Sequence, residues 1–489
     1  MPDRLSALDA SFLYLEEPTT AMHVGSVMIL EAGDLDYDRL VAIVSDRIGE
    51  FSRYRQRVRE LPGRISGPVW VDDVAFDITY HVRRSALPAP GLDEQLDEFV
   101  ARIQSRALDR QHPLWEIYLV EGLAGDRVAI VTKTHQALVD GVTAVDIGHL
   151  LLDDRPDIEV PPLREWEPRR EPGDVSLVAD AVAGFARRPL TLVERIRGGL
   201  LGGTVGIAQR ALDRAGSVVT QVARTAASPA PASALNTRVG APRRYRTLRT
   251  DLAAYRAVRE AMAGGDRPVD VSVTDVVLTV LTGGIRTWLQ SHGEPVHSAT
   301  TVRAMVPVSI AEQTRAEVRG GLDADVEPGQ AGVSQVAAVF VDLPVGETSP
   351  RVRLERIAYQ TRHQAGSSRA VPAGALAGLA GFAPPTLHVL GARVGHAMSR
   401  RMFNLVVTNV PGPQRPLYVG GARMVATYPV MPLTTGHALA VGVTSYDGEV
   451  FIGLNGDRAS MTDLDVLAEG VTESLDEMCE AVGVEGARG

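Results

Sequence analysis

The stretch His135-Gln136-Ala137-Leu138-Val139-Asp140-Gly141 combines residue types suited to proton transfer. A histidine four residues before an Asp-Gly pair can act as a general base, because the pKa of imidazole lies near neutral pH. Such a base removes the proton from a hydroxyl, thiol or amine as that group attacks an electrophilic carbon. At this spacing from Asp140 the sequence has Gln136, whose neutral amide cannot take up a proton at pH 7.

The neighbours of Gln136 suggest supporting roles. Gly141 allows a tight turn into the next element, and Asp140 is expected to hold the loop through a partner such as an arginine. His135 ends a strand-like apolar run, and alternate residues of a strand face opposite sides. His135 is one residue before position 136, so its side chain should point to the side opposite to that of residue 136. This predicts a packing or hydrogen-bonding role for His135, and the alternative is that it serves as a substitute base.

Six further groups of residues occur along the chain in a characteristic order. They are Leu8–Leu13 with Met22–Gly25, Pro68–Asp72, Pro113–Glu116, Val273–Leu278, Val306–Ser309 and Thr408–Pro413. With the 135–141 stretch, which lacks the second histidine of the signature HHxxxDG, they resemble the bacterial wax ester synthase/diacylglycerol acyltransferase family. That family is related to chloramphenicol acetyltransferase and to peptide-synthetase condensation domains.

The resemblance implies an α/β fold of two chloramphenicol-acetyltransferase-like lobes, each a mixed sheet packed with helices. A long helical linker would join the lobes, and an active-site tunnel would lie at their interface. It implies transfer of a long-chain fatty acyl group from acyl-CoA to diacylglycerol, and also to fatty alcohols. Acyl-CoA is then a substrate, and neither a cofactor nor a metal is needed. Gln136 in place of the catalytic histidine implies low or abolished activity.

The resemblance also suggests a second group of site residues. It places Asn409, Pro411 and Gly412 in substrate binding, together with Thr274 and Asp275. Alternatives remain open, because Asn409 also suits a plain turn. Thr274 and Asp275 equally suit a helix start capped by Thr274 or Ser272. For the whole chain, the alternatives are a non-catalytic relative that binds acyl-CoA or lipid, and a condensation-type enzyme that uses carrier-protein thioesters.

Length and composition predict how the chain is divided. A chain of 489 residues exceeds one ordinary core. Strand-like runs such as Val24–Leu30 mixed with helix-like runs such as Asp93–Leu108 indicate an α/β class. Proline-rich breaks after Leu152 and at Ser228–Ser233 predict a first lobe over 1–154, a linker over 155–244 and a second lobe over 245–489.

Charge and cysteine content exclude some classes of function. The lone Cys479 excludes a disulfide framework. The net charge of −10 argues against nucleic acid as a partner. The start of the chain lacks the basic and apolar regions of a signal peptide. We therefore expect a cytoplasmic protein, peripheral at the inner membrane or at lipid droplets.

Two segments bear on lipid contact. The segment from Ala181 to Tyr245 contains ten arginines and only two acidic residues, Glu194 and Asp213. The segment suits either a solvated interdomain helix pair or amphipathic helices on an anionic membrane or lipid-droplet surface. The uncharged run from Ala370 to Leu390 is long enough to span a bilayer, but its prolines and glycines favour short buried helices. By resemblance, this run lines an acyl-chain channel.

Overall fold

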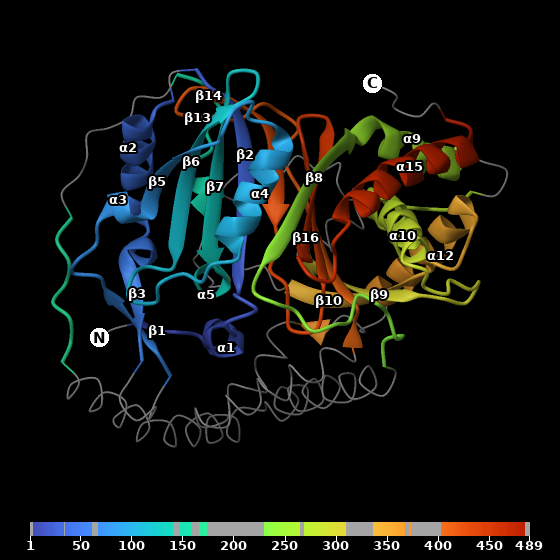
Figure 1. The fold of residues 1–489 in the computed structure, drawn as a ribbon, viewed down its shortest axis with the longest axis horizontal. Coiled ribbons are helices and arrows are strands. Elements are labelled where there is room, and N and C mark those ends of the chain that lie inside the picture. The colour runs from blue at the N-terminus through green and yellow to red at the C-terminus, as the bar shows by residue number, and fades with distance from the viewer. Residues whose placement is uncertain are drawn as a thin grey trace, which may run out of the picture.

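The computed structural model of this protein describes residues 3–33, 35–60, 67–139, 147–157, 166–173, 229–264, 268–309, 336–366, 371–372 and 402–484. Two large mixed sheets lie side by side, and helices pack on each (Figure 1). The predicted α/β class is therefore confirmed. Asp140, Gly141, the arginine-rich stretch up to residue 228 and the 370–390 run lie outside the described residues.

The first sheet has six strands in the order β13-β14-β2-β7-β6-β5. Its pairs are antiparallel except for β5 with β6. The strands are β2 (His23–Glu31), β5 (Val82–Ala86), β6 (Trp115–Leu123), β7 (Arg127–His135), β13 (Tyr418–Val419) and β14 (Ala422–Val430). The predicted strand over Val24–Leu30 is confirmed as the centre of β2. Its buried residues join a hydrophobic core around the apolar side chains of β6 and β7.

Helices and a small sheet complete this half of the molecule. The helices are α1 (Ala7–Leu15), α2 (Tyr37–Arg47), α3 (Ile78–His81), α4 (Asp93–Gln104), α5 (Gln136–Val139) and α6 (Ile147–Leu150). Short 3₁₀ turns cover Ile48–Glu50 and Ser52–Arg55. β1 (Asp3–Arg4), β4 (Val69–Asp72) and β3 (Gln56–Arg59) form a three-stranded sheet. The helix predicted over Asp93–Leu108 is confirmed as α4, which ends four residues earlier.

The second sheet has seven strands in the order β11-β10-β9-β12-β15-β16-β8. β12 is parallel to both of its neighbours, and the other pairs are antiparallel. The strands are β8 (Arg243–Asp251), β9 (Val302–Ser309), β10 (Val336–Leu343), β11 (Val371–Pro372), β12 (Leu405–Pro411), β15 (Leu439–Tyr446) and β16 (Glu449–Asp457).

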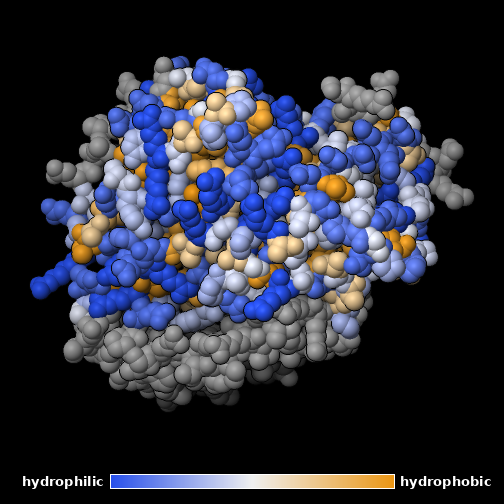
Figure 2. Space-filling view, viewed as in Figure 1, coloured by the Kyte–Doolittle hydropathy of each residue, from blue (hydrophilic) through white to orange (hydrophobic). Residues whose placement is uncertain are grey.

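Four longer helices pack beside the second sheet (Figure 1). They are α9 (Leu252–Gly264), α10 (Val273–Ser291), α12 (Pro350–Gly366) and α15 (Leu464–Val482). Their apolar faces and the sheet form a second hydrophobic core. Among the described residues no helix is both long and apolar enough to cross a bilayer. Hydrophilic side chains predominate on the face drawn in Figure 2, where hydrophobic ones form small groups.

The two sheets are joined by chain that crosses between them. β14 follows β12 in the chain, yet it pairs with β2 of the first sheet from Val430↔Gly25 to Met424↔Leu30. α4 of the first half also packs against β8, where the buried Asp97 accepts hydrogen bonds from the backbone and hydroxyl of Thr247. Burial raises the pKa of Asp97 to about 7.

One arginine of the segment between Ala181 and Tyr245 is part of this junction. Arg243 begins β8 and is only 4% exposed. Its guanidinium donates to the carbonyl oxygens of Thr19 and Gly240, at 2.5 and 2.6 Å. Arg243 therefore belongs to the folded junction and is not available to a lipid surface.

Close packing of α10 against α15 gives a stability prediction. A Cβ atom at Gly284 would lie 2.5 Å from Val471 Cγ2 and 2.9 Å from the Val471 backbone nitrogen. We expect Gly284→Val to lower the free energy of unfolding by about 1–3 kcal/mol through overpacking. Gly264→Val, at an exposed position with nothing near its Cβ, is the matched control. Equal thermal midpoints for the two variants would contradict the close contact.

Candidate active site

The end of β7 carries the residues that the sequence singles out. β7 ends at His135, and α5 begins at Gln136. The Gln136 backbone N–H donates to Met22 O at 2.9 Å, and the His135 N–H donates to Leu114 O at 2.9 Å. The start of α5 is therefore tied to two segments of the chain. α5 lies beside α1 at the lower end of β7 (Figure 1).

The His135 side chain points into the fold and is 1% exposed. Its Nδ1 accepts a hydrogen bond of 3.0 Å from the Ala137 backbone N–H. An accepting Nδ1 places the proton of the neutral ring on Nε2. Nε2 lies 3.7 Å from Oε2 of Glu16. Nδ1 is thus hydrogen-bonded, while the buried Nε2 faces Glu16 without a hydrogen-bond partner among the described residues. This fits a hydrogen-bonding role for Nδ1.

Glu16 is a buried carboxylate just after α1 that accepts hydrogen bonds from Arg110 and lies beside two histidine rings. Its oxygens lie 3.3 Å from His23 Nε2 and 2.6 Å from Arg110 Nη2. Burial alone would raise the pKa of Glu16, but hydrogen bonds to His135, His23 and Arg110 hold that pKa well below its usual range. Glu16 is therefore an anion within the fold.

His23 lies directly opposite His135 in the β2–β7 ladder. The two rings meet edge to face with centroids 5.8 Å apart. Burial lowers the pKa of His23 to about 4, so its ring is neutral at pH 7. In the sequence, His23 stood out only as part of the Met22–Gly25 landmark. Its position beside His135 shows that it is part of the support of α5.

Gln136 is half-buried, and its amide oxygen is the unusual feature. Oε1 is shielded from solvent and has no hydrogen-bond partner among the described residues. A buried acceptor left without a donor typically costs about 1–3 kcal/mol. A molecule that presents a hydroxyl or N–H at this point would satisfy that oxygen.

The second predicted group lies where β12 meets the start of α10. Asn409 Nδ2 donates to Thr274 Oγ1 at 2.9 Å, while Asn409 Oδ1 is buried without a partner among the described residues. Ser272 caps α10 and exchanges hydrogen bonds with Asp275, which also accepts from Thr361. The predicted capping by Ser272 is confirmed. Asp275 is fully engaged in that cap.

Pro411 and Gly412 follow Asn409 at the end of β12. A Cβ atom at Gly412 would lie 2.2 Å from the carbonyl oxygen of Ser445. Only glycine therefore allows this close approach of the chain to β15. No hydrogen bond or ion pair between described residues joins the 409–412 group to His135 or Gln136.

Two residues at this site were missed from the sequence. Glu16 and Arg110 carry no motif, and only the fold places them next to His135. His23 did belong to a recognised landmark, Met22–Gly25. The available signal was the strand pattern of the Val24–Leu30 run. If that strand paired with the one ending at His135, His23 at its start would lie opposite His135.

The only lysine of the sequence lies on β7 two residues before His135. The Lys133 side chain is 1% exposed, and its Nζ donates to the carbonyl oxygens of Ile103 and Arg106. Burial lowers the pKa of Lys133 to about 8. Lys133 thereby satisfies carbonyl groups at the C-terminal end of α4, a role that needs no chemistry.

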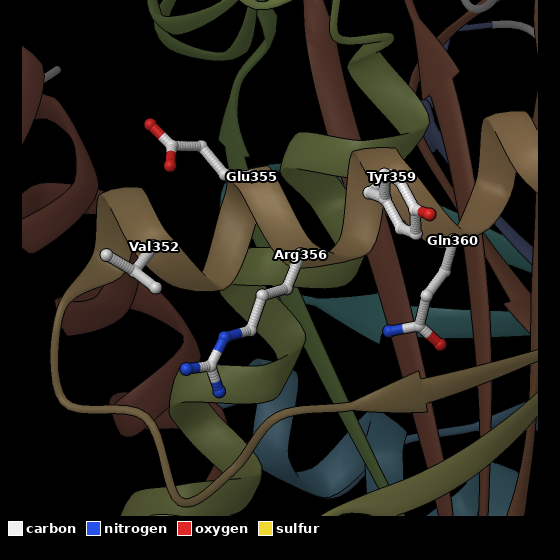
Figure 3. A pocket seen from close by; sticks show the side chains of 5 residues that line it. All are labelled: Val352, Glu355, Arg356, Tyr359 and Gln360. Carbon is white, nitrogen blue, oxygen red and sulfur yellow. The ribbon is translucent and has the colours of Figure 1, made fainter.

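A surface hollow lies along α12 (Figure 3). Its lining polar groups are already engaged: Arg356 pairs with Glu347 at 3.0 Å, and Gln360 exchanges hydrogen bonds with the Asp342 backbone. None of the predicted site residues lines it. Among the described residues, no group of His, Cys, Asp and Glu is arranged to hold a metal ion.

Comparison with known proteins identifies the family. Residues 5–277 match the wax ester synthase/diacylglycerol acyltransferase catalytic domain, and residues 334–479 match the WS/DGAT C-terminal domain. The chain belongs to the wax ester synthase/diacylglycerol acyltransferase family. The resemblance inferred from the sequence landmarks is thus confirmed.

Individual relatives of this family match all or about half of the chain. The probable diacylglycerol O-acyltransferase tgs2 of Mycobacterium tuberculosis is 31% identical over 491 residues, covering 99% of this chain and 100% of that protein. The probable enzyme tgs3 of the same organism is 45% identical over 262 residues, covering 53% of this chain and 96% of that protein.

Solved structures support the two-domain fold. The wax ester synthase/diacylglycerol acyltransferase of Marinobacter aquaeolei VT8 has a TM-score of 0.66 at 26% identity and covers 98% of this chain and 100% of its own. The first condensation domain of the calcium-dependent antibiotic synthetase has a TM-score of 0.58 at 15% identity, covering 100% of this chain and 98% of its own. The latter likeness concerns the fold alone.

The buried His23 gives a prediction about acid stability. Its pKa in the fold is about 4 against an ordinary 6.5, so between these values the unfolded chain binds more protons. The free energy of unfolding should therefore fall as pH drops from 6.5 to 5, by about 2 kcal/mol from this residue. His23→Gln removes that dependence, and the thermal midpoints of both proteins at pH 7.5 and pH 5 measure it. Parallel losses in the two proteins would contradict the assignment.

Proposed function

We propose that this protein is an O-acyltransferase that moves a long-chain fatty acyl group from acyl-CoA to the hydroxyl of diacylglycerol, and also of fatty alcohols. Family membership supports the reaction class. The observation that supports the acceptor side is the buried Oε1 of Gln136, which has no hydrogen-bond partner in the described part of the chain. It accepts a hydrogen bond from the attacking hydroxyl and so orients the hydroxyl oxygen toward the thioester carbonyl.

The identity of residue 136 determines how fast the reaction proceeds. The alcohol oxygen bonds to the acyl carbon, the carbon–sulfur bond breaks, and the hydroxyl proton ends on the CoA sulfur. A histidine at 136 would carry that proton, whereas a neutral amide cannot. Orientation and stabilisation of the oxyanion remain available, so a slow reaction is expected. His135 does not replace the base, because its ring is buried, its Nδ1 accepts from the Ala137 backbone and its Nε2 faces Glu16 inside the fold.

The remaining predicted site residues have a place in this proposal. Asn409 would offer a substrate its amide oxygen, which has no partner among the described residues, while Thr274 holds its nitrogen. Pro411 and Gly412 shape the turn beside it, and Asp140 and Gly141 position the loop after Gln136. We propose that the two lobes, 1–154 and 245–489, enclose a tunnel with the acyl branch along residues 370–390.

Substitution at position 136 tests the proposal. We expect Gln136→His to raise kcat by about 10²–10⁴-fold, the usual contribution of a general base. Gln136→Asn, which keeps an amide, is the matched control and should remain slow. The assay follows CoA release from palmitoyl-CoA with diacylglycerol and with hexadecanol as separate acceptors. Equal rates for Gln136→His and the unsubstituted protein would exclude position 136 as the base site.

Gln136 also favours a second function. In this alternative the protein binds acyl-CoA or neutral lipid without catalysing acyl transfer. The same assay separates the two. Binding of palmitoyl-CoA without transfer, in both the unsubstituted protein and Gln136→His, would support the carrier or sensor role. Transfer that requires a carrier-protein thioester and releases no CoA would instead support a condensation-type enzyme.

We further propose a peripheral location at the inner membrane or lipid droplets, through the arginines between residues 187 and 224. Binding to vesicles with anionic lipid should weaken as salt rises, because exposed charges are screened over about 10 Å at 0.1 M salt. A variant with Arg187, Arg188, Arg195 and Arg197 changed to Gln should bind less. Sedimentation with vesicles measures both effects, and salt-insensitive binding would overturn this role.

A further inference from the structure

The backbone on both sides of the Gln136 side chain is held by hydrogen bonds. On one side the Gln136 N–H donates to Met22 O at 2.9 Å. On the other side the Ala137 N–H donates to His135 Nδ1 at 3.0 Å. The second bond depends on a side chain whose ring exists in two neutral forms. The direction of the residue 136 side chain therefore depends on which nitrogen of His135 carries the proton.

Glu16 lies where it controls that proton. Its Oε2 is 3.7 Å from His135 Nε2, and the same oxygen accepts from Arg110 Nη2 at 2.6 Å. A carboxylate on this side favours the proton on Nε2 and leaves the Nδ1 lone pair for Ala137. The reverse form would direct an N–H at the Ala137 N–H, which removes a hydrogen bond from the first turn of α5.

The tertiary structure brings residues from several segments of the chain around Glu16. Its side chain is 10% exposed, and its partners come from three different segments: His23 on β2, His135 on β7 and Arg110 before β6. A buried carboxylate without partners would be strongly disfavoured. Arg110 also donates to Leu13 O in α1 at 2.8 Å, so the group joins α1 to the strand ends.

We propose that Glu16 is a positioning residue for position 136, acting by fixing the tautomer of His135 so that the imidazole caps the first turn of α5. The proposal rests on the proposed acyl transfer for its catalytic consequence. Its structural content, the tautomer of His135, is independent of activity. Glu16 itself does not touch the reacting atoms.

The direct test is the ¹⁵N spectrum of histidine-labelled protein at pH 7.5, with His135 assigned from the His135→Asn variant. The unsubstituted protein should carry the His135 proton on Nε2. In Glu16→Gln the amide NH₂ can donate to Nε2, so the proton should move to Nδ1. Glu17→Gln, the exposed neighbour that accepts from Thr435, is the matched control and should leave the spectrum unchanged.

The catalytic arm uses Gln136→His as background, where the rate is high enough to measure changes. Adding Glu16→Gln should lower kcat by about 10–100-fold, because small misplacements of a reacting group have effects of this size. KM for palmitoyl-CoA should stay unchanged, and adding Glu17→Gln should alter neither constant. A general loss of folding would instead lower the thermal midpoint and the amount of active protein.

Three results would overturn the proposal: Nδ1 protonation in the unsubstituted protein, an unchanged tautomer in Glu16→Gln, or a changed tautomer with unchanged kcat in the Gln136→His background. The first needs only the His135→Asn variant for assignment and therefore stands even if Glu16→Gln does not fold. Failure of the proposed function has a different signature. No acyl transfer by Gln136→His would reject that function, while the spectra would still decide whether Glu16 fixes His135.

Discussion

Pairing of β14 with β2 is the contact on which the arrangement of the site depends. β2 lies between β14, from the last part of the chain, and β7, which ends at His135. Without β14 one edge of β2 would expose unpaired backbone groups. The same pairing brings the loop after β14 to the loop before β2, where the hydroxyls of Thr20 and Thr435 lie 3.1 Å apart. One ladder thus closes the two halves around the end of β7.

Local sequence signals predicted individual elements well. Apolar residues of β2 and the helical periodicity of α4 gave both elements nearly to their bounds. Ser272 and Asp275 form a capping box whose residue types and spacing are visible in the sequence. The resemblance carried by the landmarks implied a fold of two lobes, and the solved Marinobacter relative shares the fold observed here.

Local sequence patterns could not predict contacts between residues that are far apart in the chain. Nothing near Glu16 marks it as a neighbour of His135, since the carboxylate simply follows a short, mainly apolar helix. Likewise, the pattern of β14 indicates a strand but does not say which sheet receives it. Strand alternation predicted that His135 and Gln136 differ in direction. It did not predict that Nδ1 of His135 would accept from Ala137 or that Nε2 would face Glu16 inside the fold.

The buried Lys133 has a consequence for handling the protein in solution. The sequence contains no other lysine, and this one is enclosed against α4. Reagents that modify side-chain amines therefore have no exposed target while β7 and α4 remain packed. Modification of Lys133 requires these elements to separate, so its rate reports opening of the first core. The reactivity of the Lys133 side-chain amine therefore reports whether the half of the molecule that carries Gln136 is folded.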